Sequence, residues 1–249
     1  MKPDYTALEF PAPPLSRPYV IVNMVMSADG RTILGGSEQG IGSKVDQRLM
    51  RELRVHADVI FNGATTLRVS GVSPRTGDPL LEQLRVSRGK PAAATSAIIT
   101  RSGDLPYDRP FFTATDFDAI VYLGHDAPPG VFDRIVSAGR SVVGLPAEKA
   151  MTWMLAHMRH ELGAELVLCE GGASVNGQLV AEDLVDEFFV TLGPVIVGGK
   201  GLPGAVEGPS FTKETAPRLR LLSATPNEDT GELYLRYRVI RESGNSANG

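Results

Sequence analysis

A glycine-rich stretch behind a short apolar run is the segment of this sequence best suited to hold a ligand. Leu166–Cys169 is an apolar run typical of a buried strand, and Glu170, Gly171 and Gly172 follow it, before a segment that can begin a helix. Glycine lets the backbone approach a phosphate closely, and the first N–H groups of a helix point toward such an anion. The pattern predicts an anion site beside a carboxylate, although an ordinary strand-to-helix turn has the same spacing.

Polar or glycine-rich segments also follow other predicted strands, at residues 27–31, 63–66 and 100–102. Because the carboxyl ends of parallel strands meet at one edge of a sheet, these segments would gather there as a dinucleotide site requires. Arg101 stands where a guanidinium could favour a 2′-phosphate, and with it NADP over NAD. A solvated loop arginine fits that position equally well.

Two further groups of reactive side chains indicate no separate site. The single cysteine, Cys169, lies inside the apolar run, and we expect a small buried hydrophobe there instead of a nucleophile. His157 and His160 share a predicted helix face with Glu161, but nothing nearby in the sequence completes a metal site. We therefore expect a solvated helix face and no bound metal.

The composition is that of a cytoplasmic protein with a substantial core. The chain has 249 residues, of which 42% are hydrophobic, and its net charge of -4 gives no reason to expect nucleic acid or an anionic membrane as a partner. One cysteine allows no disulfide within the chain, which fits a reducing compartment. We expect no signal peptide and no membrane span, since the N-terminus is rich in proline and no apolar run is long enough.

Alternating strands and helices are predicted to position these segments. Ser43 should cap a helix over 43–56, and a second helix should cover 150–162. Strands are expected at 19–26, 58–62, 97–99, Ala119–Leu123, Ser141–Gly144, Leu166–Cys169, 187–191 and 195–197. Residues 71–95 should form a loop around the edge, and 219–222 with 233–239 a hairpin that turns at 229–231.

This pattern predicts one α/β domain with a mostly parallel central sheet, helices on both faces and an antiparallel C-terminal hairpin. We expect the domain to cover residues 18–242. Residues 1–17 contain four prolines and should form an extended N-terminal arm, and 243–249 should form a disordered tail.

A series of motifs in a fixed order makes the analysis more specific. The motifs are Met26-Ser27-Ala28-Asp29-Gly30, Leu53-Arg54, Gly63-Ala64-Thr65-Thr66, Glu170-Gly171-Gly172, Val185-Asp186-Glu187, and Pro194 with Gly198-Gly199. Over roughly residues 18–240, this series resembles the reductase domain of the bacterial riboflavin-biosynthesis deaminase-reductase, the RibD C-terminal family. The resemblance implies a dihydrofolate-reductase-like three-layer fold and an enzyme that uses NADPH to reduce the ribosylamino group of a phosphorylated aminopyrimidine to a ribitylamino group.

The resemblance also implies which residues form the site. The cofactor would contact Thr66, Thr100, Arg101, Ser102, Gly171, Gly172, Ala173, Ser174 and Val175. The substrate, a small molecule, would lie near Arg54 and Glu170, and Asp29 and Glu170 are the candidate catalytic residues. For Asp29, a turn whose carboxylate accepts hydrogen bonds from nearby backbone N–H groups is an equal alternative. Family members are commonly dimers, so a homodimer is expected.

Two departures from the family pattern matter for function. Ser70-Gly71 stand where the family often has an Asp-Asp-Pro or Asp-Asn-Pro element, so the anchor for the substrate phosphate does not transfer, and Arg75 is a candidate substitute. The sequence also lacks the His-x-Glu and Cys-x-x-Cys zinc motifs of the family's deaminase half. The proton donor stays open among Asp29, Glu170 and water. Alternative functions are reduction of dihydrofolate or another pterin, and nucleotide binding without catalysis.

Overall fold

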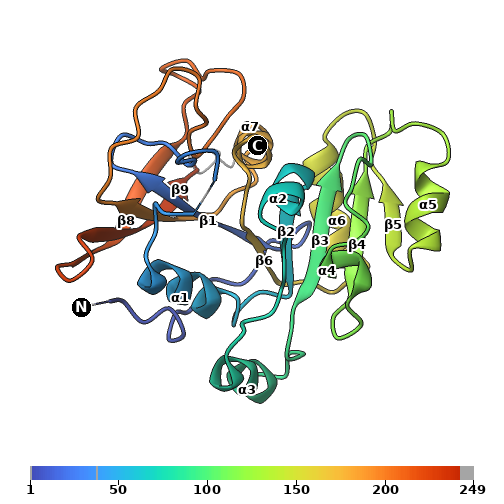
Figure 1. The fold of residues 1–249 in the computed structure, drawn as a ribbon, viewed down its shortest axis with the longest axis horizontal. Coiled ribbons are helices and arrows are strands. Elements are labelled where there is room, and N and C mark those ends of the chain that lie inside the picture. Colours follow the sequence, from blue (N-terminus) through green and yellow to red (C-terminus); the bar gives the residue numbers. More distant parts are fainter. Residues whose placement is uncertain (1, 38, 242–249) are drawn as a thin grey trace, which may run out of the picture.

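A nine-stranded sheet runs through the computed structural model, which describes residues 2–37 and 39–241 (Figure 1). The strand order is β5-β4-β3-β2-β6-β1-β7-β9-β8. The strands are β1 (Tyr19–Ser27), β2 (Val59–Gly63), β3 (Thr95–Thr100), β4 (Ala119–Leu123), β5 (Ser141–Gly144), β6 (Leu166–Cys169), β7 (Glu187–Gly193), β8 (Arg218–Asn227) and β9 (Glu232–Ile240). Strands β1 to β7 pair in parallel, whereas β9 runs antiparallel to both β7 and β8. The predicted parallel sheet with a C-terminal hairpin is confirmed.

Helices cover both faces of the sheet, which gives the three predicted layers. The helices are α1 (Lys44–Leu53), α2 (Ala64–Val69), α3 (Pro79–Ser87), α4 (Pro110–Thr113), α5 (Val131–Ser137), α6 (Ala150–His160) and α7 (Ala173–Ala181). One core packs α6 and α7 on one face, around side chains such as Phe61 and Val167. On the other face, Ile60 and Leu168 pack against α1, and Ile98 packs against α2, α4 and α5. Adjacent strand residues therefore bury on opposite faces, as a two-sided sheet requires.

The helix predicted at 43–56 begins where its cap residue indicates. The Ser43 hydroxyl accepts hydrogen bonds from the backbone N–H groups of Val45 and Asp46, the ordinary N-cap arrangement. The regular helix ends at Leu53, earlier than predicted, and residues 54–56 form a turn. Arg54 therefore lies just past the end of α1, where its side chain can leave the helix.

Two predictions about secondary structure are wrong. Residues 71–95 are not a simple loop, because Asp78 accepts hydrogen bonds from Leu80 and Leu81 and so caps helix α3, which begins at Pro79. Residues 195–197 are not a strand. Their backbone turns around the carboxylate of Asp29, which accepts hydrogen bonds from Val197 N and Gly198 N at 3.0 and 2.7 Å.

The described part of the N-terminal arm, residues 2–17, packs against α1 and the sheet. Tyr5 is buried, and Phe10 contacts Tyr19 and Phe189. The Tyr5 backbone N–H donates to Glu52 at 3.1 Å, and the Tyr5 carbonyl lies 2.7 Å from Nε2 of His56. The arm therefore completes one wall of the core on the α1 face. The predicted tail, 243–249, lies outside the described residues.

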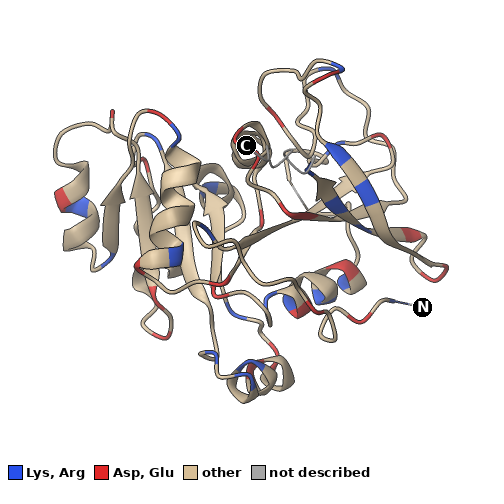
Figure 2. Cartoon of the chain, turned by 180° about the vertical axis from the view of Figure 1, so that it is seen from behind, with Lys and Arg blue, Asp and Glu red and all other residues tan. Residues whose placement is uncertain are grey.

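Charged side chains of both signs are interspersed along the elements, α1 included (Figure 2). Glu187 in β7 is completely buried and is neutralised by Arg236 and Arg238 of the neighbouring strand β9. Within the described residues, no helix has the length and apolar character needed to cross a membrane.

Candidate active site

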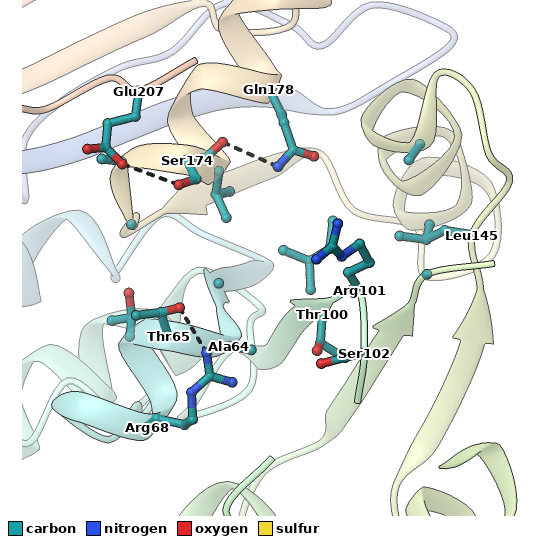
Figure 3. A pocket seen from close by; sticks show the side chains of 18 of the residues that line it. Ala64, Thr65, Arg68, Thr100, Arg101, Ser102, Leu145, Ser174, Gln178 and Glu207 are labelled. Atoms are coloured by element: carbon teal, nitrogen blue, oxygen red, sulfur yellow. Dashed lines mark hydrogen bonds between the residues drawn. The ribbon is translucent and has the colours of Figure 1, made fainter. Parts of the chain in front are cut away.

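A cleft with a volume of about 780 Å³ opens at the carboxyl ends of strands β2 to β6 (Figure 3). Parallel sheets bind their ligands at this edge. The residues that follow these strands line it: 63–66 after β2, 99–102 in β3 and the turn after it, 124–126 after β4, 145–147 after β5, and 172–175 after β6. The segments at 63–66 and 100–102 and the start of the glycine-rich helix meet here as predicted, whereas residues 27–31 do not line the cleft.

Two helices begin at the cleft, side by side. Helix α2 starts directly after Gly63, and α7 starts directly after Gly172. A Cβ on Gly63 would lie 2.9 Å from a methyl group of Val175, and a Cβ on Gly172 would lie 3.4 Å from Oγ1 of Thr66. A side chain at position 63 would force the Val175 methyl to shift, whereas a Cβ at position 172 would make an ordinary van der Waals contact. Because the first residues of both helices line the same cleft, their first N–H groups offer a favourable environment for an anion there.

The turn after β3 places Arg101 over the cleft. Thr100 fixes this turn, because its Oγ1 accepts from Gly103 N at 3.0 Å and its carbonyl accepts from Gly124 N at 2.8 Å. A Cβ on Gly124 would lie 2.9 Å from the Cα of Arg101, so the end of β4 holds the turn by close backbone packing. The Arg101 side chain extends into the open space (Figure 3) and is exposed, and no described residue pairs with its guanidinium.

One acidic side chain stands at the start of α7. Glu207 lies with its carboxylate 3.4 Å from Oγ of Ser174, and its backbone N–H donates to the carbonyl of Ala173 at 3.0 Å. On the α2 side, Arg68 donates to Oγ1 of Thr65 at 3.0 Å (Figure 3). The negative charge of Glu207 would repel an anion bound at this point, but the side chain is exposed and has room to turn away.

Glu170 and Arg54 form a two-pronged ion pair next to the glycine turn. Nε and Nη2 of Arg54 donate to the two carboxylate oxygens of Glu170 at 2.7 and 2.8 Å, and each side chain is 10% exposed. The third nitrogen of Arg54, Nη1, donates to the carbonyl of Arg75 at 2.6 Å. These contacts join the end of β6, the end of α1 and the segment before α3 into one rigid group.

The side chain of Arg75 has partners outside that group. Its guanidinium pairs with Asp116 and lies 4.8 Å from the ring centre of Phe117. Only its backbone carbonyl contacts Arg54 among the described residues. Any phosphate bound by Arg75 would therefore share the guanidinium with Asp116.

Asp29 acts as a clamp between two loops. It accepts from Oγ of Ser27 at 2.6 Å and from the backbone N–H groups of Val197 and Gly198. The hydrogen bond from Ser27, followed by those from the backbone, lowers the pKa of Asp29 to about 2. Its carboxyl is therefore ionised at neutral pH and has no proton to donate.

The reactive side chains outside the cleft have ordinary structural surroundings. Cys169 is completely buried, its Sγ lies 3.3 Å from Oδ1 of Asn176, and burial raises the pKa of the thiol to about 12. This agrees with the buried hydrophobe that the sequence predicted. Nδ1 of His157 lies 3.1 Å from the hydroxyl of the buried Tyr122, and the ring stacks on Trp153. Among the described residues, no group of three His, Cys, Asp or Glu side chains could hold a metal.

The predicted site residues thus fall into three groups. The cleft is lined by Thr66, Thr100, Arg101, Ser102, Gly172, Ala173, Ser174 and Val175. Gly171 is next to it, and Glu170, Arg54 and Arg75 form the second group beside it; the third is Asp29, in its loop clamp.

Some lining residues were not predicted. His125 and Asp126 come one residue after the end of β4, so the reasoning that polar residues gather at strand ends could have found them. Pro203 and Glu207 could not be found this way, because they come from a loop that only the tertiary fold brings to the cleft.

Comparison with known proteins agrees with this architecture. A curated 2,5-diamino-6-ribosylamino-4(3H)-pyrimidinone 5′-phosphate reductase from Methanothermobacter thermautotrophicus is 29% identical over 230 residues, 90% of this chain and 99% of the relative. A pyrimidine reductase-like protein from Corynebacterium diphtheriae superposes with a TM-score of 0.80 at 22% identity, over 92% of this chain and 94% of that one.

The fold is also that of dihydrofolate reductase. The enzyme from Enterococcus faecalis superposes with a TM-score of 0.52 at 12% identity, over 90% of this chain and 97% of that one, and it was solved as a complex with NADP(H). The predicted dihydrofolate-reductase-like fold is therefore confirmed. Residues 18–229 match the family model described as the RibD C-terminal domain, and the chain belongs to that family.

Proposed function

We propose that this protein is an NADPH-dependent reductase of riboflavin biosynthesis that converts a phosphorylated ribosylaminopyrimidine to its ribitylamino product. Relatives within the family carry the name of such a reductase. The observation that carries the proposal is the meeting of two helix starts in one cleft at the carboxyl ends of parallel strands. That geometry suits a dinucleotide, which has a pyrophosphate at its centre.

The residues of the cleft fit NADPH. The starts of α2 and α7 would hold the pyrophosphate, with hydroxyl groups from Thr66 and Ser174 beside them. Arg101, which no described residue pairs with, would bind the 2′-phosphate that distinguishes NADPH from NADH. The cleft volume is within the range of roughly 300–1,000 Å³ that is usual for small-molecule sites. Bound NADPH would supply a hydride, while the protein would orient the substrate and exclude water.

The pair formed by Glu170 and Arg54 is the proposed anchor for the pyrimidine. Arg54 uses one lone pair on each carboxylate oxygen of Glu170, and a carboxylate has about four acceptor sites. The remaining sites can accept hydrogen bonds from a ring N–H or an amino group of the substrate. Arg75, shared with Asp116, is the proposed contact for the substrate phosphate.

The overall reaction adds a hydride to C1′ of the ribosyl group and a proton to its ring oxygen, so that the sugar opens to a ribityl chain. Because Asp29 is ionised at neutral pH, the proton comes from water or from another group. We assign Asp29 the task of holding the loop at 195–198, whose continuation brings Pro203 to the cleft.

A half-exposed apolar sheet face supports a homodimer. Phe188, Val190 and Leu192 of β7 pair with residues of β9 in a register that puts Tyr237 and Leu235 on the same face. All five are partly exposed, whereas the alternate residues of β7 are buried. A second copy could cover this face. We expect light scattering to give the mass of a dimer, and Leu235→Glu to give a folded monomer; a monomeric wild-type protein would rule the homodimer out.

Steady-state oxidation of NADPH tests the proposed function. We expect turnover with the phosphorylated ribosylaminopyrimidine and none with dihydrofolate. Turnover with dihydrofolate instead would make the protein a pterin reductase. NADPH binding with no turnover on either substrate would indicate a nucleotide-binding protein without this activity.

A further inference from the structure

The buried guanidinium of Arg85 is the least expected polar group in this molecule. Arg85 lies on α3 and is completely buried. None of the described residues forms an ion pair with it, and its Nη2 atom is buried without a hydrogen-bond partner among them. The charge of Asp58 attracts Arg85, but Asp58 forms its ion pair with Lys90, and a buried cation without a direct counter-ion is costly to keep in a folded protein. Its position therefore calls for a reason beyond ordinary packing.

The acceptors of Arg85 show what it holds. Nη1 donates to the carbonyls of Arg54 and Ala57, the latter at 2.8 Å, and Nε donates to the carbonyl of Pro91, also at 2.8 Å. The carbonyl of Arg54 belongs to the turn that follows the last regular residue of α1, and the carbonyl of Ala57 lies just past that turn. A cation at this end of a helix satisfies carbonyls that no longer have partners in the helix.

Arg54 is the residue in that turn with a proposed role at the substrate. Its backbone carbonyl is held by Arg85, while its side chain is held by Glu170 and by the carbonyl of Arg75. Helix α3 and the segment before it therefore bind Arg54 both at its backbone carbonyl and at its guanidinium. A second contact joins the same two elements farther from Arg54: Asp78 at the start of α3 forms an ion pair with Arg48 of α1.

We infer that Arg85 is a positioning residue for the substrate site: it fixes the backbone of Arg54 so that the Arg54 guanidinium presents the Glu170 carboxylate to the pyrimidine. This inference rests on the proposed function. Arg85 itself touches neither the cleft nor Glu170 in the described residues. It reaches the pair through the backbone of Arg54, and its removal should loosen the pair without changing the cofactor cleft.

A double-mutant cycle separates this role from simple stabilisation. Arg85→Gln keeps donor groups but removes the charge and the forked geometry. We expect it to raise the substrate KM about fivefold to tenfold, which corresponds to about 1–1.4 kcal/mol, with kcat and the Kd for NADPH within about twofold. In an Arg54→Ala background, the same substitution should change the substrate KM by less than about twofold, because the group that it positions is gone.

Thermal unfolding provides the structural control. Arg85→Gln should lower the melting temperature in both backgrounds, because the buried carbonyls lose a partner whether or not Arg54 is intact. Arg85→Lys should recover part of the wild-type KM. If Arg85→Gln does not fold, Arg85→Lys takes its place in the cycle. Arg220→Gln is the control: Arg220 is exposed on β8 and lies outside the contacts of α3 and Arg54, so the substrate KM should not move.

The outcomes distinguish the inference from the function that it depends on. A wild-type protein without turnover on the ribosylaminopyrimidine would overturn the proposed function. An active wild-type protein in which Arg85→Gln raises KM equally in both backgrounds, or leaves it unchanged in both, would overturn the positioning role of Arg85.

Discussion

Two charged side chains at the site have opposite surroundings, and these decide what each can do. Arg101 is exposed and unpaired among the described residues, so its positive charge is available to a bound anion. Glu170 is almost buried and already held at both oxygens by Arg54. The first is suited to recognise a ligand that arrives with charge, and the second to present a fixed acceptor.

Removing the Arg101 guanidinium should therefore change cofactor preference. Arg101→Ala is expected to weaken NADPH binding by about 1.5–3 kcal/mol, roughly tenfold or more, as for loss of a charge-assisted hydrogen bond, and to leave NADH nearly unaffected. Fluorescence titration measures both. Arg220→Ala, which removes an equal charge from the exposed strand β8, should have no effect. Equal losses for both cofactors would mean that Arg101 supports the turn instead.

Neutralising Glu170 should affect the substrate. Glu170→Gln keeps the size, removes the charge and leaves Arg54 without its counter-ion, so kcat/KM for the pyrimidine should fall about tenfold or more. The Kd for NADPH should change little. Glu165→Gln, at the exposed opposite end of the same strand, is the control. Weaker NADPH binding with unchanged substrate affinity would assign Glu170 to the cofactor.

Sequence reasoning reached the identity of these residues but not their partners. The strand-end rule led to Arg101 and Glu170 because both directly follow buried strands. The pairing of Glu170 with Arg54 spans 116 positions in the chain, and no local pattern encodes it. The same holds for Arg75, whose partner, Asp116, is 41 positions away.

At the level of elements, the site depends on how closely α2 and α7 begin to one another. The approach is tightest at Gly63, where a Cβ would lie 2.9 Å from a methyl group of Val175 in α7. Gly172 has backbone angles that other residues adopt, with φ -75° and ψ -173°, so a substitution there alters the space around it more than the backbone.

Filling the space at Gly172 should thus block the cofactor and spare the fold. Gly172→Val adds methyl groups beside Oγ1 of Thr66 and over the start of α7. We expect NADPH binding to become undetectable by titration, with the far-ultraviolet circular dichroism unchanged. Ala181→Val places the same side chain at the exposed far end of α7 and should bind normally. Normal affinity in Gly172→Val would remove this turn from the site.

The elements that the sequence predicted are those with strong local signals. Strands such as β2 and β4 are wholly buried and mostly apolar, and Ser43 marks the start of α1. Helices α2 to α5 were missed because they are short, and α3 to α5 also lie in segments rich in proline, glycine and arginine. In α3, the cap Asp78 followed by Pro79 was a readable signal that the composition of the segment concealed.

At the level of the whole molecule, the N-terminal arm and the sheet share one core through His56. Nε2 of His56 donates to the Tyr5 carbonyl, and its ring lies edge-on to Phe10. Burial, and then the charges of Arg88, Lys90 and Arg236, lower the pKa of His56 to about 4, against the raising effect of the Tyr5 carbonyl. The histidine is therefore neutral in the folded protein at physiological pH.

This shift predicts a loss of stability in mild acid. The unfolded chain binds the proton near pH 6.5, above the folded value, so the stability due to neutral His56 is complete above about pH 6.5 and is lost as the pH falls toward 4. Between pH 7.5 and pH 5, the wild-type protein should lose about 2 kcal/mol more free energy of unfolding than His56→Gln. Urea titrations measure this. His160→Gln, on an exposed surface, should behave as wild type, and a parallel loss in His56→Gln would refute the assignment.

The central claim is that this molecule transfers a hydride from NADPH to the sugar carbon of a phosphorylated ribosylaminopyrimidine. Incubation with NADPH carrying deuterium at the transferred position, followed by mass spectrometry and NMR of the product, tests it most directly. The account predicts a ribitylamino product with one deuterium on C1′ of the ribityl chain. Deuterium on a pyrimidine ring carbon, or an unchanged ribosyl group after NADPH has been oxidised, would contradict it.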